Sequence, residues 1–478
     1  MYTKRTQSNN SGLSFFRHRQ STFKIRNFKR LFNIIVCLLF LFALSTNADA
    51  ETTQGSDYQT LNLEDCLALA GKYNPALSGA REKIRELIAD YQAAKSQFFP
   101  QLTLLSYYER LDPHRLTSSG ITPSTQELNN DEAYAAITGK QILFNGGITR
   151  YSSQAAKKGA DAQRQDVLRT GDAVAFAVTQ AFYLLVEAKE NLKVARDALG
   201  QRRDFLGLTE AFFKAGKVTK LDLLRAKSQV SEAEQAQVEA DNALRLAREV
   251  LARTIGLNEH AEVDIRGRPS QEFAPAPDVD SLWGEALKTN PEIKQLSLEI
   301  EQSRDLVKAA KGGYSPEVSL QGAVGTRHQN TGGTRGEWLA GVFIQFPFFQ
   351  GGLTEAQVSA ASSRYLQALE RKRDRLNSLK IDLTTAWKNL ENGRSGVTEA
   401  RQTVATNEEA YASAQTLYRN GKAIGLDVLQ AEVDLTSSRL NLIKYAIAYE
   451  IARAQIRQIV GSPFFEPFGQ SDKGGREK

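Results

Sequence analysis

The sequence has few of the residues that bind metals. Its 478 residues include only two cysteines, one methionine and four histidines. The methionine is the initiator, so the chain has no ladder of thioether ligands for soft metals. None of His18, His114, His260 and His328 has the helical i, i+4 spacing or a neighbouring cysteine that is typical of metal sites. We therefore predict no metal site, no cofactor, no catalytic centre and no enzymatic activity.

Cysteine is too scarce to form a disulfide within the mature chain. Cys37 lies in an N-terminal apolar stretch, without the small residues expected just before a lipidated cysteine. Cys66 is then the only cysteine left after processing. It shares the apolar stripe of a predicted helix with Leu63 and Leu67, which indicates a small buried side chain rather than a reactive thiol.

The N-terminus has the pattern of a secretory signal peptide. Residues 1–30 contain eight Lys or Arg, residues 31–44 are apolar, and Ala48-Asp49-Ala50 fits a small-x-small cleavage site. We predict that residues 1–50 are removed; the alternative is an uncleaved anchor. Without them, 53 basic and 54 acidic residues remain, because the segment holds eight of the 61 basic and one of the 55 acidic residues. Nothing in this balance suggests nucleic acid.

Long apolar runs are also missing. No stretch of the mature chain approaches 18 consecutive apolar residues, so the sequence predicts no membrane-spanning helix there. Any membrane insertion would have to use strands.

One glycine-centred stretch occurs twice, at an offset of 205 residues. The copies are GKVTKLDLLRA at 216–226 and GKAIGLDVLQA at 421–431, each between two long helical patterns. A glycine at such a point can take a positive φ and end a helix. We predict that each copy is the tip of a helical hairpin and a docking surface. In that surface, Gly216 and Gly421 would let a partner approach the backbone closely. Leu221 and Leu426 would provide apolar anchors.

The duplication extends beyond the tips. Asn74-Pro75 matches Asn290-Pro291 at an offset of 216, and Gly146-Gly147 matches Gly351-Gly352 at 205. Similarity on this scale indicates two tandem copies of one structural unit. The predicted organisation is a first repeat at 51–268, a second repeat at 269–463 and a disordered tail at 464–478.

Each repeat is expected to start with a helix and continue with two strands. Apolar residues recur at helical spacing over 61–97 and about 279–311, and each Asn-Pro should interrupt the helix. Period-2 alternation then predicts two antiparallel hairpins. Their strands cover 102–109 and 133–144, then 318–325 and 338–346, joined by loops at 112–130 and 326–336.

A long helical hairpin completes each repeat. Ile148–Lys214 and Leu353–Arg419 contain no proline. At ~1.5 Å per residue each would form a helix about 100 Å long. Such a helix cannot bury a face inside an ordinary globular core, so a coiled coil or helical array is predicted. Return helices should end near Ile255 and Val460, with a linker at 257–280.

The strands have faces compatible with lipid but are too few to close a barrel. Trp338, Ala340, Val342 and Ile344 alternate with other residues on one strand. Open strand edges are not tolerated in lipid, and a small barrel needs about eight strands. Two chains would supply eight strands and three would supply twelve, and the strands alone leave both open. The alternative is a periplasmic sandwich with helical arms.

The duplicated order of helix, strand hairpin, long helix, glycine tip and return helix resembles the outer membrane efflux protein family, typified by TolC. The resemblance covers residues 61–463 and is carried by Leu61–Asp65 with Asn74-Pro75, Phe144–Gly147, Phe349–Gly352 and the two tips. It implies a mainly α fold with a membrane β-barrel. In a homotrimer, a twelve-stranded barrel in the outer membrane would continue into a long periplasmic α-helical barrel. The implied partners are a periplasmic adaptor, docked through the tips, and an inner membrane transporter.

Asp222 and Asp427 occupy the same position in the two tips, six residues after the glycine. One interpretation is an acid at a helix N-terminus, favoured by the helix dipole. The other is a ring of six carboxylates in a trimer, which would favour cations and raise the affinity of the carboxylates for protons.

The resemblance assigns both aspartates, together with Tyr418, to a periplasmic gate. Ala423 and Gln430 stand where TolC has a gate arginine and a further acid. An ionic lock through that arginine is therefore not implied here, although Lys422 or Arg419 could substitute.

The leading hypothesis is a passive exit channel that serves a tripartite efflux pump or a type I secretion system. The alternative is a structural coiled-coil protein of the envelope, such as an adhesin stalk or spacer. A stalk requires neither the strand hairpins nor the duplicated tips. The cargo and the pump are left open.

Overall fold

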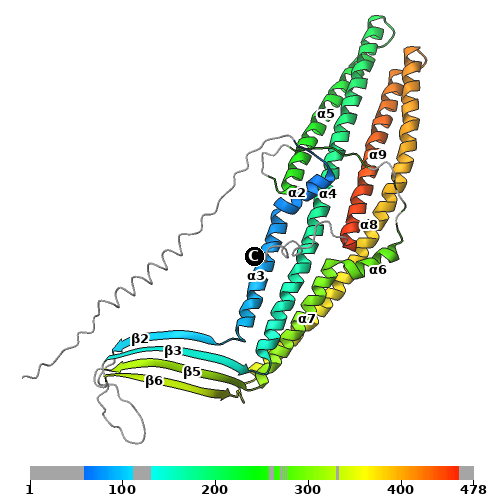
Figure 1. Cartoon of the computed structure of the whole chain (residues 1–478). Helices are drawn as coiled ribbons and strands as arrows, with labels where there is room; N and C mark the ends of the chain where they lie inside the picture. Colours follow the sequence, from blue (N-terminus) through cyan, green and yellow to red (C-terminus); the bar gives the residue numbers. More distant parts are fainter. Residues whose placement is uncertain are drawn as a thin grey trace, which may run out of the picture. The chain divides into compact units, whose positions relative to one another are not determined.

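The helices and strands lie close to where the sequence patterns place them (Figure 1). The computed structural model describes residues 59–110, 131–257, 263–269, 273, 275, 277–329 and 333–461. The predicted signal peptide, the loop at 112–130 and the tail at 464–478 lie outside the described residues. The first repeat contains β1 (Gln59–Leu61), α2 (Leu63–Tyr73), α3 (Pro75–Ser96), β2 (Gln101–Arg110), β3 (Asp131–Phe144), α4 (Ile148–Lys214), α5 (Lys220–Ile255) and β4 (Val263–Ile265). The second contains α6 (Val279–Thr289), α7 (Pro291–Lys311), β5 (Glu317–Gln329), β6 (Gly333–Gln345), α8 (Leu353–Arg419) and α9 (Gly425–Val460).

The two Asn-Pro pairs interrupt the first helices as predicted, and they also anchor them. The Asn74 side chain accepts hydrogen bonds from the N–H groups of Ala76 and Leu77 and donates one to the Thr254 carbonyl, 2.8 Å away. Asn290 likewise accepts from Ile293 and donates to the Ile459 carbonyl at 2.8 Å. Each asparagine therefore caps one helix and ties it to the end of the return helix of its own repeat.

The structure differs from the prediction at the start of the first helix, in the linker and in the loop at 326–336. The first helix begins at Leu63 and not at Leu61, because Leu61 belongs to β1. β1 pairs in parallel with β4, a short strand inside the predicted linker. The predicted loop at 326–336 is mostly strand, because the pairing of β5 with β6 continues to Gln329 and Gly333. His328, placed in that loop from the sequence, therefore lies in β5.

The four longer strands form one antiparallel sheet in the order β2-β3-β5-β6. The pairing of β3 with β5 joins the two repeats, so both hairpins belong to one sheet. β2 and β6 are the outer strands, and each has one edge without a neighbour in the described part of the chain.

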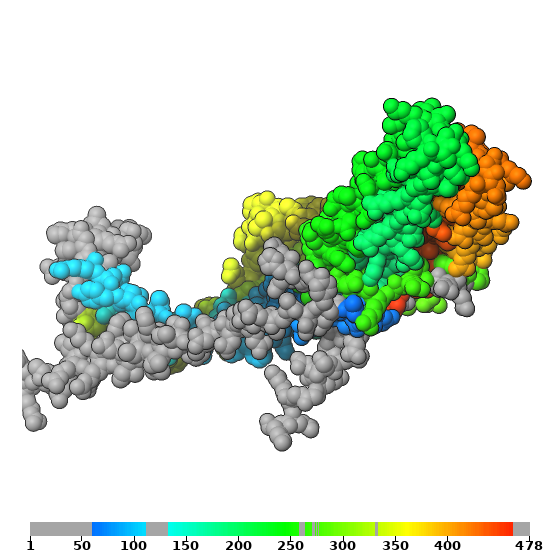
Figure 2. Space-filling view, turned by 90° about the horizontal axis from the view of Figure 1, so that it is seen from above, coloured from blue at the N-terminus to red at the C-terminus, as the bar shows by residue number. Residues whose placement is uncertain are grey.

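The long helices pack side by side as two hairpins. α5 packs on α4, α4 packs on α9, and α9 packs on α8, so α5 and α8 are the outer members of the row. Figure 2 shows the first hairpin in green beside the second in orange. The largest cluster of buried side chains lies along α4 and includes Val178, Leu185, Leu251 and Ile255, together with Cys66.

Cys66 is fully buried, as predicted. Burial, reinforced by the neighbouring Asp65 charge, raises the pKa of its thiol to about 12. At neutral pH the thiol is therefore protonated and unreactive.

α4 includes an 18-residue window whose mean hydropathy would suit a membrane span. However, 61% of that window is buried within the fold. α4 as a whole packs against α5, α7, α3, α9 and α2.

Candidate functional site

The two hairpin tips have the same backbone geometry. Gly216 and Gly421 have φ values of 68° and 67°. The N–H groups of Gly216 and Lys217 donate to the carbonyls of Phe213 and Phe212, and those of Gly421 and Lys422 donate to Tyr418 and Leu417. This reciprocal pair of bonds is the Schellman motif, in which a glycine with positive φ closes the helix. The prediction that both glycines end helices is confirmed.

The tips carry apolar side chains without cover in the single chain. Leu221 is 55% exposed and Leu426 is 56% exposed, and Ile424 and Leu224 are more than half exposed as well. A Cβ added to either tip glycine would meet no atom within 4 Å. The surface is therefore accessible, although its role in docking remains a prediction.

Asp222 and Asp427 both fix the start of a return helix. The Asp222 carboxylate accepts from the Thr219 N–H at 3.0 Å and the Thr219 hydroxyl at 2.7 Å. Asp427 accepts from the Ile424 N–H at 3.1 Å. These contacts agree with the helix-start interpretation, while the gate role remains untested.

The Thr219 hydroxyl lowers the pKa of Asp222, and the Thr219 N–H adds to the effect. Hydrogen bonds to a carboxylate favour its charged form. The ring of carboxylates expected from the sequence would form between copies and would raise the pKa of the aspartates. A single chain shows only the local effect, which lowers the pKa of Asp222.

Tyr418 lies in an aromatic cluster behind the tips. Its side chain is buried, and its ring centroid is 5.3 Å from that of Phe205 and 5.5 Å from that of Phe212, both on α4. Its hydroxyl lies 3.4 Å from the Thr209 hydroxyl. Tyr418 therefore joins the second hairpin to the first, which its position in the sequence does not reveal.

A largely buried ion pair, also missed from the sequence, lies beside this cluster on the side farther from the tips. The Arg202 guanidinium on α4 contacts Glu432 on α9 at 3.0 Å. Arg202 also donates to the Gln229 carbonyl on α5, and Thr436 donates to the second Glu432 oxygen at 3.1 Å. Glu432 is buried, Arg202 is partly buried, and both have further hydrogen bonds. Removing only one partner would therefore leave an uncompensated charge at the contact of the two hairpins.

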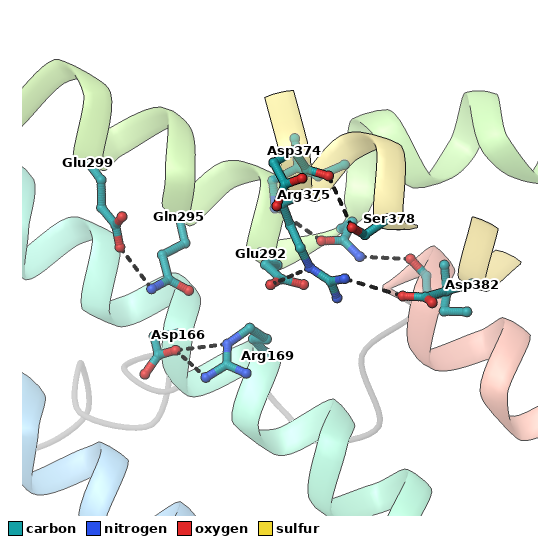
Figure 3. A network of polar contacts seen from close by, with 12 residues as sticks. Asp166, Arg169, Glu292, Gln295, Glu299, Asp374, Arg375, Ser378 and Asp382 are labelled. Atoms are coloured by element: carbon teal, nitrogen blue, oxygen red, sulfur yellow. Dashed lines mark hydrogen bonds and ion pairs between the residues drawn. The ribbon is translucent and has the colours of Figure 1, made fainter. Parts of the chain in front are cut away.

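A second polar network joins the start of α7 to α8 (Figure 3). Arg375 of α8 donates to Glu292 of α7 at 2.7 Å and to Asp382 of its own helix at 3.2 Å. The hydrogen bond to Glu292 raises the pKa of Arg375 further above its usual range. Arg169 of α4 lies nearby and pairs with Asp166. The network fixes α7 against α8, the long helix of the same repeat.

The two faces of the sheet differ in chemistry. One face is apolar and exposed, with Trp338 at 80%, Leu102 at 73% and Ile344 at 71% exposure. On the other face, Arg327 bonds to Glu337 and Glu132, and the Tyr107 hydroxyl donates to Glu132. These four residues come from all four strands. An apolar face opposite a polar one is the pattern of a membrane barrel, with lipid outside and water inside.

The fold and these surfaces define a class of protein: a membrane channel that combines a β-sheet wall with long helical hairpins. The model of the family described as outer membrane efflux protein matches residues 67–257 and 282–462. The chain belongs to the outer membrane efflux protein family, and it is an outer membrane protein with two repeats of the family's unit.

Curated relatives and solved structures agree with this assignment. The chain is 23% identical to outer membrane efflux protein BepC of Brucella suis over 386 residues, 80% of this chain and 81% of BepC. It is 23% identical to outer membrane protein TolC of Escherichia coli over 434 residues, 84% of this chain and 83% of TolC. The crystal structure of VceC from Vibrio cholerae superposes with a TM-score of 0.73 at 19% identity, covering 84% of this chain and 97% of VceC. A membrane protein from Pseudomonas aeruginosa gives 0.75 at 18% identity, covering 87% and 97%.

Proposed function

We propose that three copies of this chain form a passive exit duct across the outer membrane. The observation that carries the proposal is the sheet, which has an apolar exposed face and edges at β2 and β6 that no other described strand pairs with. In lipid those edges must be paired, and β6 of one copy can pair with β2 of the next. Three copies supply twelve strands, the number implied by the family.

The polar face of the sheet would line the water-filled interior. The helical hairpins would continue this interior into the periplasm, since at ~1.5 Å per residue α4 and α8 are about 100 Å long. The chain would hold the path open for solutes and supply no energy of its own, which suits a channel driven by an inner membrane transporter.

The tips would dock a periplasmic adaptor, in either a tripartite efflux pump or a type I secretion system. Their exposed leucines offer apolar anchors, and Gly216 and Gly421 leave the backbone open to close approach. Asp222, Asp427 and Tyr418 would form the periplasmic gate. The aspartates would supply its charge, and Tyr418 would hold the two hairpins together behind it.

Single-channel recording in planar bilayers tests the duct. We expect discrete conductance steps from the purified assembly and none from the same protein after heating has separated its copies. A protein that stays assembled yet produces no conductance would contradict the proposal and favour a structural stalk.

A further inference from the structure

The face of the first helical hairpin that points away from β4 carries an open groove. β4 lies against the opposite face, where Asp264 contacts Lys189 of α4 at 3.2 Å and Arg248 of α5 at 3.6 Å. At ~3.6 residues per turn, residues two positions apart point in nearly opposite directions. Asn191 and Val250 therefore point away from β4, and both line this groove, whose volume is about 640 Å³. We call it the first groove.

The layer on the opposite face places the first groove in the assembly. α2 and the β1–β4 pair form a second layer over α4 and α5 (Figure 1). In the ring that three copies would form, such a layer on the inner side would fill the passage, so it belongs outside. The first groove, on the other face of the hairpin, would then line the duct once in each copy.

The lining of the first groove is mostly apolar. Alanine, leucine and valine account for most of its residues, and Leu184, Leu246 and Val250 are exposed. Apolar surface is unfavourable on a wall that faces water, and an exposed apolar patch of this kind marks an interaction site. The volume lies within the range of ~300–1,000 Å³ that is typical of sites for small organic molecules.

The charge left in the first groove is negative. Glu187 and Glu239 line it together with Arg202, whose guanidinium is already paired with Glu432 at 3.0 Å. Burial raises the pKa of Glu187, although the charge of Lys444 opposes the rise. Glu239 is exposed. A bound molecule with a positive charge would be attracted by carboxylates on both helices of the hairpin.

The second repeat has a groove at the equivalent place, with a different lining. Every residue that lines this second groove corresponds to a residue of the first groove at the offset of 205. In the second groove, the positions of Leu184, Glu239 and Val250 are occupied, in this order, by Asn389, Lys444 and Gln455. Because both repeats pack their hairpins in the same way, that packing does not require an apolar and acidic lining. The difference points to a ligand of the first groove.

We propose that the first groove binds lipophilic cations inside the duct, with their apolar groups against its leucine, valine and alanine side chains and their charge near Glu187 and Glu239. In three copies, three such grooves would alternate around the wall with three more polar ones. The inference rests on the proposed threefold duct, because there the groove faces the passage. It adds a chemical class of ligand that the wall itself recognises.

Binding of tetraphenylphosphonium to the purified trimer tests the site, and tetraphenylborate serves as an anion of the same shape. We expect one bound phosphonium per chain at saturation, measured with an ion-selective electrode. Leu184→Asn with Val250→Gln gives the first groove the residues of the second and should abolish this binding. Both side chains are exposed, so folding should be unaffected. Asn389→Ala in the second groove is the control and should bind phosphonium like the wild type.

The charge of the groove is tested separately. Glu239→Lys should weaken phosphonium binding roughly tenfold and strengthen borate binding, because attraction of the cation is replaced by repulsion. Equal affinity of the wild type for the two ions would overturn the role of the carboxylates. Equal phosphonium binding by the wild type and by Leu184→Asn with Val250→Gln would overturn the site.

Single-channel recording on the same preparations shows whether the groove faces the passage. Bound phosphonium should lower the conductance of the wild type, and should not lower that of Leu184→Asn with Val250→Gln. Binding without a change in conductance would place the groove outside the duct and overturn the proposal. A conducting trimer that binds no phosphonium would overturn this inference alone, and would indicate that another part of the assembly covers the groove. A protein without trimers or conductance would reject the proposed function, and this inference with it.

Discussion

Replacing both Gly216 and Gly421 by tryptophan is expected to abolish export while trimers still assemble. No atom lies within 4 Å of a Cβ built at either position, so the new side chains would project away from the chain's own packing. They would project from the surface that we assign to the adaptor. The positive φ values of 68° and 67° add backbone strain, about 1–2 kcal/mol for each non-glycine residue, which assembly should tolerate.

A matched control separates the effect of backbone strain from the effect of side-chain size. Gly216→Ala with Gly421→Ala imposes the same backbone strain with a side chain too small to block docking, and it should export nearly as well as the wild type. Accumulation of a fluorescent pump substrate in cells, with trimers quantified in envelopes, provides the readout. Normal export by the double tryptophan variant would refute the docking role of the tips.

Replacing Asp222 and Asp427 by asparagine is expected to reduce the cation selectivity of the duct and to weaken block by multivalent cations from the periplasmic side. Three copies would bring six carboxylates to one height. At a closed mouth they would lie within a Debye length of ~8 Å at physiological salt, so screening would be weak. The Thr219 hydroxyl lowers the pKa of Asp222, so this carboxylate should stay ionised well into the acidic range. Asparagine keeps the oxygen that accepts from the Thr219 and Ile424 N–H groups, so the helices should start as before.

Reversal potential under a salt gradient measures this selectivity. Glu234→Gln with Glu408→Gln is the control, since it also removes one acid from each hairpin. These two residues pair with Arg203 and Arg439 on the hairpin flanks. A reversal potential that does not move in the tip variant would show that Asp222 and Asp427 only start helices.

The long helices could be predicted to the residue because glycines mark both of their ends. Gly147 and Gly352 precede α4 and α8 at φ values of 83° and 82°, and the tip glycines follow them. Between these markers the helical pattern has no proline to interrupt it. By contrast, β1 and β4 are three residues each, too short for alternation to be visible in a sequence. The extension of β5 and β6 was hidden by their Gly- and Thr-rich ends, which resemble a loop in composition.

The tips could be located from the sequence, but the contacts behind them could not. Gly216 and Gly421 repeat a local pattern, whereas Arg202 and Glu432 lie 230 residues apart and belong to no motif. Tyr418 was singled out by resemblance alone, and only the structure shows that Phe205 and Phe212 surround it. Local signals define elements, while the register between two helices depends on packing that a single sequence does not display.

The mass of the detergent-extracted protein tests the account most directly, because the duct and the gate both require three copies. Analytical ultracentrifugation of the unheated protein should give a mass of three chains, and brief heating should convert it to single chains. A stable monomer before heating would contradict the account, since the edges of β2 and β6 would then be left without a partner in lipid.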